Sequence, residues 1–195
     1  MDKLFNPFRY IAGTKSLVWG LIFIISEIVL LYGNGYVMDG YVHIAHKPDG
    51  MLLWQAALIQ ILMWLLPALI LYVCGLALSH SKIRIIDILG TTAFAQLLLL
   101  PMIVPMLIPA VSEMLNGVAA IVLDPSSVAT IENLPVVSLL LFAVWSLVWL
   151  VLFYVWNYNA FATSCNVRGA KAIAVYVAVV LVVIFVAPYI YALIR

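Results

Sequence analysis

Five long apolar stretches, separated by short polar segments, run through this chain. Four of them contain no charged residue, and the fifth, between Leu17 and Tyr32, contains only Glu27. A helix of about 20 apolar residues is long enough to cross a bilayer. The sequence therefore predicts an all-α, polytopic membrane protein, a single domain of five transmembrane helices. The expected elements are a tail at residues 1–16 and spans at 17–33, 51–78, 88–111, 136–157 and 172–193.

Composition supports this class and leaves no room for a soluble catalytic domain. Hydrophobic residues make up 67% of the chain and charged residues 9%, against about 25% charged in a soluble domain. The longest polar segments, Gly33–Gly50 and Ser112–Pro135, are too short to fold independently. Within the second, the apolar run Val118–Leu123 is expected to dip into the outer interface. A net charge of +1 gives no indication of nucleic-acid binding. Function must lie in the bundle, its loops, or its surface toward lipids and other proteins.

Basic residues are unevenly divided between the two sides of the predicted membrane. Seven fall on the side of the N-terminus and two on the other: Lys3, Arg9, Lys15, Lys82, Arg84, Arg168 and Lys171, against Lys47 and Arg195. Cytoplasmic loops carry the excess of Lys and Arg. We therefore expect a cytoplasmic N-terminus, an external C-terminus and a multi-pass protein of the cell's inner (plasma) membrane. Cys74 and Cys165 then lie toward the cytoplasm, where thiols stay reduced and no disulfide is expected.

Glu27 is the one ionisable residue well inside a span. A charged, unpaired carboxylate at this depth costs several kcal/mol, so it should be protonated, hydrogen-bonded or in contact with a wet cavity. Gln60 and Gln96 are candidate partners at similar depth. Two interpretations follow: Glu27 bridges helices, or it is linked to protons or substrate in transport.

Helix contacts are expected where small residues cluster. The third span begins with small and polar residues around Gly90, a composition that favours close helix approach. Pro101, Pro105 and Pro109 then follow at four-residue spacing, so this half must be bent or unwound and covered by protein. The last span begins with a strip of small residues at four-residue spacing, Ala170, Ala174 and Ala178. In the fourth span, a stripe of aromatic residues that includes Trp145 and Trp149 predicts a packing or interfacial surface.

Catalytic and metal-binding patterns are weak. His43 and His46 have a spacing that would place two imidazoles on one helical turn, with Asp39 and Asp49 as further candidate ligands. Nothing in the sequence fixes these four in register, and a solvated polar loop is the favoured interpretation. No zinc-protease, serine-hydrolase, intramembrane-protease or phosphate-loop motif is present. We therefore expect no enzyme activity, no cofactor and no metal.

Several segments together resemble the Yip family of five-span membrane proteins, whose eukaryotic members interact with Rab-type GTPases. The resemblance rests on a start at Asn6-Pro7-Phe8, a first span beginning near Trp19, and a third span in which Gly90–Ala95 leads into Pro101. A tryptophan-rich fourth span then precedes Gly169-Ala170-Lys171-Ala172. Eukaryotic members carry a long cytoplasmic N-terminal region, whereas about sixteen residues precede the first expected span here, which resembles the short bacterial branch.

The resemblance implies a non-catalytic role in membrane organisation, protein sorting or assembly, without GTPase binding. Expected partners are membrane lipids and a membrane protein or further copies of this chain. The alternative is a small permease or channel subunit that uses Glu27, Gln60 and Gln96, since broken helices and buried polar residues mark substrate paths.

Overall fold

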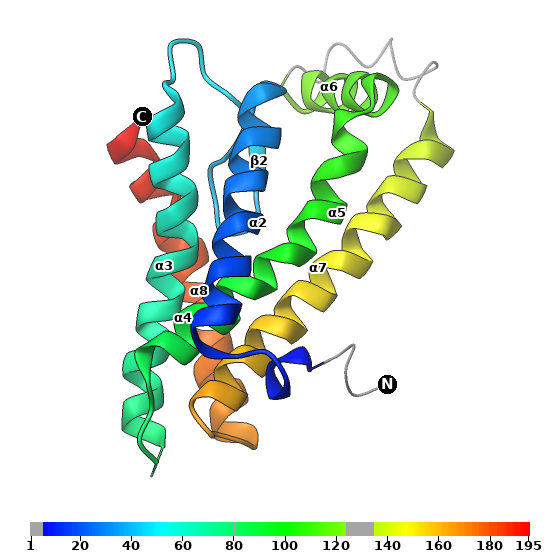
Figure 1. Cartoon of the computed structure of the whole chain (residues 1–195). Helices are drawn as coiled ribbons and strands as arrows, with labels where there is room; N and C mark the ends of the chain where they lie inside the picture. Colours follow the sequence, from blue (N-terminus) through cyan, green and yellow to red (C-terminus); the bar gives the residue numbers. More distant parts are fainter. Residues whose placement is uncertain (1–5, 80, 124–134) are drawn as a thin grey trace.

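The computed structural model describes residues 6–79, 81–123 and 135–195, and its secondary structure is 79% helical. Among these residues, five helical segments are long and apolar enough to cross a membrane (Figure 1). They are α2 (Gly13–Gly33), α3 (Leu53–Leu78), the segment Ile85–Leu107, α7 (Val136–Ser164) and α8 (Ala170–Ile194). The all-α class and the five candidate spans are confirmed.

The boundaries of the spans differ from the expected ones in ways that length explains. The first span begins at Gly13 rather than at residue 17, which gives 21 residues. At 1.5 Å per residue this reaches about 30 Å, the thickness of the hydrocarbon core. The fourth span continues to Ser164, seven residues beyond the expected end. Residues 1–5 of the expected tail, with Lys3, lie outside the described residues.

The third span is broken into four short pieces, as its prolines predict. It consists of α4 (Ile85–Ala95), the 3₁₀ turn η2 (Gln96–Leu99), α5 (Leu100–Ile103) and the 3₁₀ turn η3 (Val104–Leu107). A proline leaves the carbonyl four residues earlier without its helical donor. The carbonyl freed by Pro101 accepts from the amide of Leu100, and the one freed by Pro109 accepts from the amide of Ile108. The 3₁₀ turns thus supply local donors for two of the three carbonyls.

The third carbonyl is satisfied by a different helix. Pro105 frees the oxygen of Pro101, which accepts a hydrogen bond of 2.8 Å from the indole Nε1 of Trp145 on α7. Non-helical backbone is tolerated at membrane depth only where such partners exist. This half of the third span was expected to be covered by protein, and the hydrogen bond from Trp145 is one contact that covers it.

Beyond the third span the chain turns and forms α6 (Pro109–Leu123), which lies across one end of the bundle (Figure 1). Ile108, with extended backbone angles, makes the turn. The third span consequently ends at Leu107, four residues before its expected end at 111. The run Val118–Leu123, expected to dip into the outer interface, is the second half of α6.

The helices α2 and α4 form the closest seam of the bundle. A Cβ atom placed on Gly20 would overlap with the backbone and side chain of Ala93. One placed on Gly90 would come within 2.5 Å of the carbonyl oxygen of Gly13. The hydroxyl of Ser16 donates to the carbonyl of Gly90 across 2.8 Å. Gly90, expected at a helix contact, therefore lies in this seam. Gly20, on the facing helix, is a second glycine of the seam and lies against Ala93.

The tail is part of the core. The 3₁₀ turn η1 (Pro7–Arg9) buries Phe8, whose ring meets those of Phe94 and Trp156 edge to face, with centroids 6.4 and 5.8 Å apart. The amide of Asn6 donates to the hydroxyl of Thr163 at 3.3 Å. The Asn6-Pro7-Phe8 start thus fixes the tail against α7.

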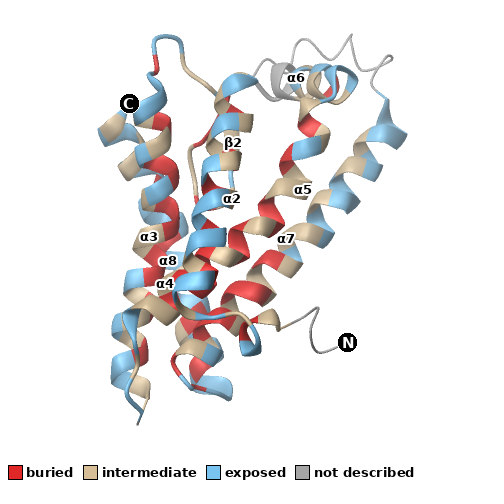
Figure 2. Cartoon of the chain, in the orientation of Figure 1, coloured by how far each residue is buried: buried red, intermediate tan, exposed pale blue. Residues whose placement is uncertain are grey.

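Helix α7 leans away from the bundle over half of its length. Its buried residues are confined to the second half: Phe153, Trp156, Asn157, Ala160 and Phe161. The first half, next to α6, is exposed on most of its faces (Figure 2). The side chains there are mostly Val and Leu, which suit contact with lipid chains.

The buried face of α8 differs from the strip of small residues. Ala172, Tyr176, Val179, Val183 and Ala187 are buried. Ala170, Ala174 and Ala178 are exposed, so no helix in the described part of the chain covers them. A role for this strip in contact with another protein stays a prediction.

Candidate functional site

The segment between α2 and α3 turns back into the bundle (Figure 1). It forms an antiparallel hairpin of β1 (Tyr36–Met38) and β2 (Ile44–His46), in which Met38 lies opposite Ile44. All three residues of β1 are buried. A solvated polar loop was expected here, and this expectation is wrong: residues 36–46 are a re-entrant hairpin.

The turn of the hairpin reaches deep into the bundle. Tyr41 is buried at the tip, and its ring lies 5.7 Å from that of Phe153 and 6.2 Å from that of Tyr154, measured between centroids. These two residues lie beyond the midpoint of the 29-residue helix α7, counted from the end where the hairpin enters. At its base the hairpin is tied to α6, because the hydroxyls of Tyr36 and Ser112 form a hydrogen bond of 2.8 Å.

A sequence signal for the hairpin exists. Asp39-Gly40 stands between two short runs that contain aromatic and β-branched residues, and Asp-Gly is a general turn signal. The turn that forms is the five-residue segment 39–43, since Met38 pairs with Ile44, and Gly40 lacks the positive φ of a two-residue Asp-Gly turn. The amide of Asp39 donates to the carbonyl of His43 and closes the turn. The glycines and histidines of this segment instead favoured the interpretation as a solvated loop.

The two histidines have separate structural partners. His43 Nδ1 lies 2.5 Å from the carboxylate of Asp39. The ring of His46 lies over that of Tyr36, with centroids 4.9 Å apart. Among the described residues, no three His, Cys, Asp or Glu side chains come together at one point. His46 lies in a strand and His43 in the turn before it, so the helical turn that their spacing suggested does not form.

A cavity of about 650 Å³ lies on one side of the hairpin, between the hairpin, the broken third span, α6 and α7. This is the volume of a ligand pocket of ordinary size. Its walls are mainly apolar, and its polar side chains are few. The lining includes Tyr36, His43, His46, Met102, Met106, Phe142 and Ser146. The cavity therefore suits an apolar chain with one hydrogen-bonding end.

A second cavity of about 470 Å³ lies on the other side of the hairpin tip, toward α8. It is lined by the turn residues 39–43 and by Ile184, Pro188 and Tyr191. Because Val42 and His43 belong to both cavities, the tip of the hairpin is the wall between them. The side chain of His43, which lines both cavities, is 75% exposed.

Glu27 and Gln60 form the polar pair of the membrane core. Gln60 Nε2 donates to Glu27 Oε2 at 2.8 Å, and this bond joins α2 to α3. Glu27 is 0% exposed and Gln60 is 4% exposed. The other carboxylate oxygen, Glu27 Oε1, has no hydrogen-bond partner among the described residues.

Gln96 is also buried and lies in η2, where the third span first departs from α-helical geometry. The structure thus brings together two of the three polar residues expected from the sequence, Glu27 and Gln60. Both side chains are enclosed in protein.

Comparison with known proteins adds no relative. No protein-family model matches the sequence, no curated protein matches it, and no solved structure matches the fold.

Proposed function

We propose that this chain is a non-enzymatic, multi-pass membrane protein that acts by holding lipid and a membrane-protein partner, in membrane organisation, sorting or assembly. The observation that carries the proposal is the apolar cavity beside the hairpin, at the point where α7 leans away from the bundle. A cavity with apolar walls beside lipid-facing surface suits an acyl chain or a partner's side chains.

The polar groups of this cavity support a binding role over catalysis. Asp39, His43 and Ser146 are the residue types of an acyl-transfer triad, and the first two are hydrogen-bonded. A triad also needs a bond from the imidazole to the nucleophile. His43 and Ser146 both line the cavity, but no hydrogen bond joins them. Without that bond, Ser146 lacks an activating base.

Native mass spectrometry of the protein released gently from its own membrane tests the proposal. We expect a defined lipid or protein adduct on the wild type. Ser146→Phe places a ring in the cavity and should remove the adduct. Ala143→Phe is the matched control, because Ala143 is exposed on the same helix and does not line the cavity. Equal adducts on both variants would contradict the proposal.

A small permease or channel subunit is the second candidate, favoured by the buried Glu27 and the broken third span. A proton-linked carrier would lose its flux with Glu27→Gln. A bridging residue would tolerate Glu27→Gln, because an amide still bonds to Gln60, whereas Glu27→Leu would destabilise the fold. The complete enclosure of Glu27 supports the bridging role. A bare homo-oligomer carrying a small polar molecule in the mass spectrum would favour the permease instead.

The membrane and the orientation are part of the same proposal. The N-terminus is cytoplasmic and the membrane is the inner (plasma) membrane, supported by the excess of Lys and Arg on the side where α2 begins. Single cysteines report the two sides. A cysteine at Asn116, exposed on α6, should react with an impermeant maleimide in intact cells, and one at Lys171 should react only after lysis. The reverse pattern would overturn the orientation.

Kinship with the Yip family also belongs to this proposal. Its support is the set of segments that begins with Asn6-Pro7-Phe8 and ends with Gly169–Ala172, together with the five spans. The burial of Phe8 gives the first of these segments a packing role.

A further inference from the structure

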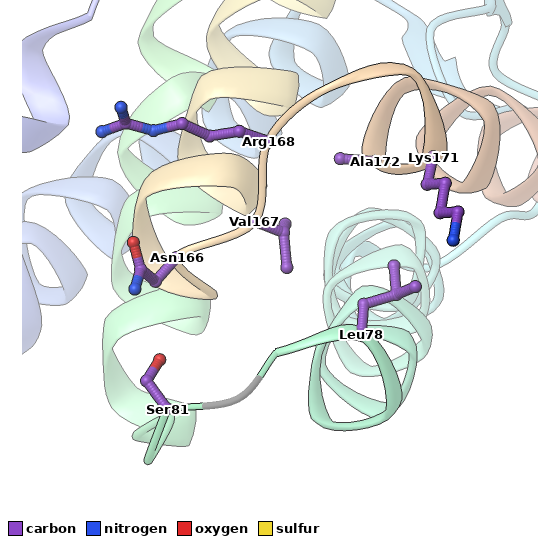
Figure 3. A pocket seen from close by; sticks show the side chains of 7 residues that line it. All are labelled: Leu78, Ser81, Asn166, Val167, Arg168, Lys171 and Ala172. Atoms are coloured by element: carbon purple, nitrogen blue, oxygen red, sulfur yellow. The ribbon is translucent and has the colours of Figure 1, made fainter.

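A separate cavity, shown in Figure 3, lies at the end of the bundle opposite α6 (Figure 1). It has a volume of about 430 Å³ and lies between Leu78 and Ser81 on one side and the connection between α7 and α8 on the other. Its lining comprises Leu78, Ser81, Asn166, Val167, Arg168, Lys171 and Ala172. The backbone of this turn is fixed in unusual geometry, since Asn166 and Gly169 both have positive φ angles, of 51° and 86°.

Among the described residues, the lining carries two positive charges and no carboxylate. Neither Arg168 nor Lys171 forms an ion pair with any residue that the structure describes. The nearby Arg84 differs, because both of its bonds, of 2.8 and 3.0 Å, go to the carboxylate of Asp87. The charges of Arg168 and Lys171 are therefore available to a ligand.

The polar side chains stand around the cavity on different sides (Figure 3). Ser81 and Asn166 lie near one another, and Lys171 lies across from them beside Leu78. The guanidinium of Arg168 extends away from the other lining residues. Ser81 and Asn166 thus offer donors on one side of the space and Lys171 on the other, and the exposed side chain of Arg168 has to rotate to reach it.

The cavity lies at the boundary between apolar and polar surface. Leu78 is the last residue of α3, and Ala172 belongs to the first turn of α8, so both walls end membrane-spanning helices. Lipid headgroups occupy this level of a bilayer. The apolar lining residues Leu78, Val167 and Ala172 face the same space as the two cations.

We propose that this cavity binds the phosphate of an anionic phospholipid headgroup. Lys171 and Arg168 make charge-assisted hydrogen bonds to the phosphate oxygens, and Ser81 and Asn166 add neutral donors. The apolar lining residues contact the first carbons of the acyl chains, next to the glycerol. Basic pockets between membrane helices are suited to such headgroups. The inference needs only the membrane-spanning bundle, and it concerns a different cavity from the one that carries the proposed function.

The test is a lipid titration of the delipidated full chain in detergent, followed by native mass spectrometry. Phosphatidylglycerol is the anionic probe, phosphatidylcholine is the uncharged comparison, and inorganic phosphate is the competitor. We expect phosphatidylglycerol to bind more tightly than phosphatidylcholine and to resist millimolar phosphate. Each cation contributes about fivefold to affinity, so the double variant Arg168→Gln, Lys171→Gln should bind about 25-fold more weakly. Both side chains are exposed, so this variant should fold normally.

The control is the double variant Lys15→Gln, Lys82→Gln, which removes the same charge from the same end of the bundle without touching the cavity lining. It should retain the wild-type affinity for phosphatidylglycerol. If both double variants lost the same affinity for phosphatidylglycerol, the lipid would be attracted by the overall positive charge of this end of the bundle. That result would contradict a binding site in the cavity. Equal affinity for the two lipids, or displacement by millimolar phosphate, would overturn the lipid headgroup as the ligand.

Discussion

Trp145 donates its indole hydrogen to the one carbonyl of the third span that a proline leaves without a donor in its own helix. The Nε1 atom lies 2.8 Å from the oxygen of Pro101, which would otherwise bond to the backbone at position 105. In a bilayer no water replaces that donor. The contact explains how a helix with prolines at 101, 105 and 109 persists beside a helix whose first half is largely exposed.

We expect Trp145→Phe to lower the free energy of unfolding by about 1 kcal/mol, since a hydrogen bond between membrane helices contributes roughly that much. Unfolding in mixed micelles measures it. Trp149→Phe is the control, because the buried Nε1 of Trp149 has no partner among the described residues. It should be close to neutral. Adding Pro105→Ala restores a backbone donor for Pro101, and the cost of Trp145→Phe should then shrink. An unchanged cost in that background would contradict the role of the bond.

The spans could be predicted from the sequence because the lipid environment makes apolar length the dominant requirement. The breaks in the third span could also be predicted, since proline removes a donor wherever it stands. The donor that replaces it could not: Trp145 is 44 residues from Pro101, and the aromatic stripe that contains it indicates packing without a partner.

The re-entrant hairpin shows a second limit of the sequence. Tyr36, Val37 and Met38 are buried among helices. A local sequence pattern does not predict which helices will cover a short strand. Glu27 and Gln60 were a simpler case, because a polar residue in a span needs a partner at its own depth. Their bond could be anticipated, whereas their complete enclosure could not.

The seam between α2 and α4 makes a prediction about Gly20. Gly20→Ala places a methyl group against the backbone of Ala93, which cannot move aside like a flexible side chain. We expect a loss of about 1–3 kcal/mol in unfolding free energy, typical of overpacking. Gly33→Ala, on the same helix, is the control because nothing lies within 4 Å of its added Cβ. If both variants unfold alike in mixed micelles, the seam is looser than described.

Tyr41 should be the main anchor of the hairpin. Tyr41→Ala removes a buried ring that contacts Phe153 and Tyr154, and truncation of a buried aromatic residue costs about 3–5 kcal/mol. Tyr189→Ala provides the comparison, since Tyr189 is 76% exposed on α8 and should cost little. Thermal unfolding in detergent measures both. A Tyr41→Ala protein as stable as the Tyr189→Ala protein would show that the hairpin does not depend on this ring.

The reactivity of Cys165 should depend on unfolding. Cys165 follows the end of α7 and is 0% exposed, with its sulfur against Gly75 of α3. Burial, followed by the neighbouring Cys74, raises the pKa of the Cys165 thiol to about 12. The thiolate is the reactive form, and at pH 9 about one thiol in a thousand is ionised at that pKa.

We therefore expect N-ethylmaleimide to leave Cys165 unlabelled in the folded protein between pH 7 and 9 and to label it promptly after unfolding in dodecyl sulfate. Peptide mass spectrometry reads the site. The raised pKa of the Cys165 thiol also makes the stability of the fold depend on pH. Between about pH 9 and 12 the folded state holds the thiol proton and the unfolded state releases it, so the free energy of unfolding falls as pH rises. Cys165→Ala should remove that part of the pH dependence. Labelling of folded protein at the unfolded rate would show that Cys165 is open to solvent.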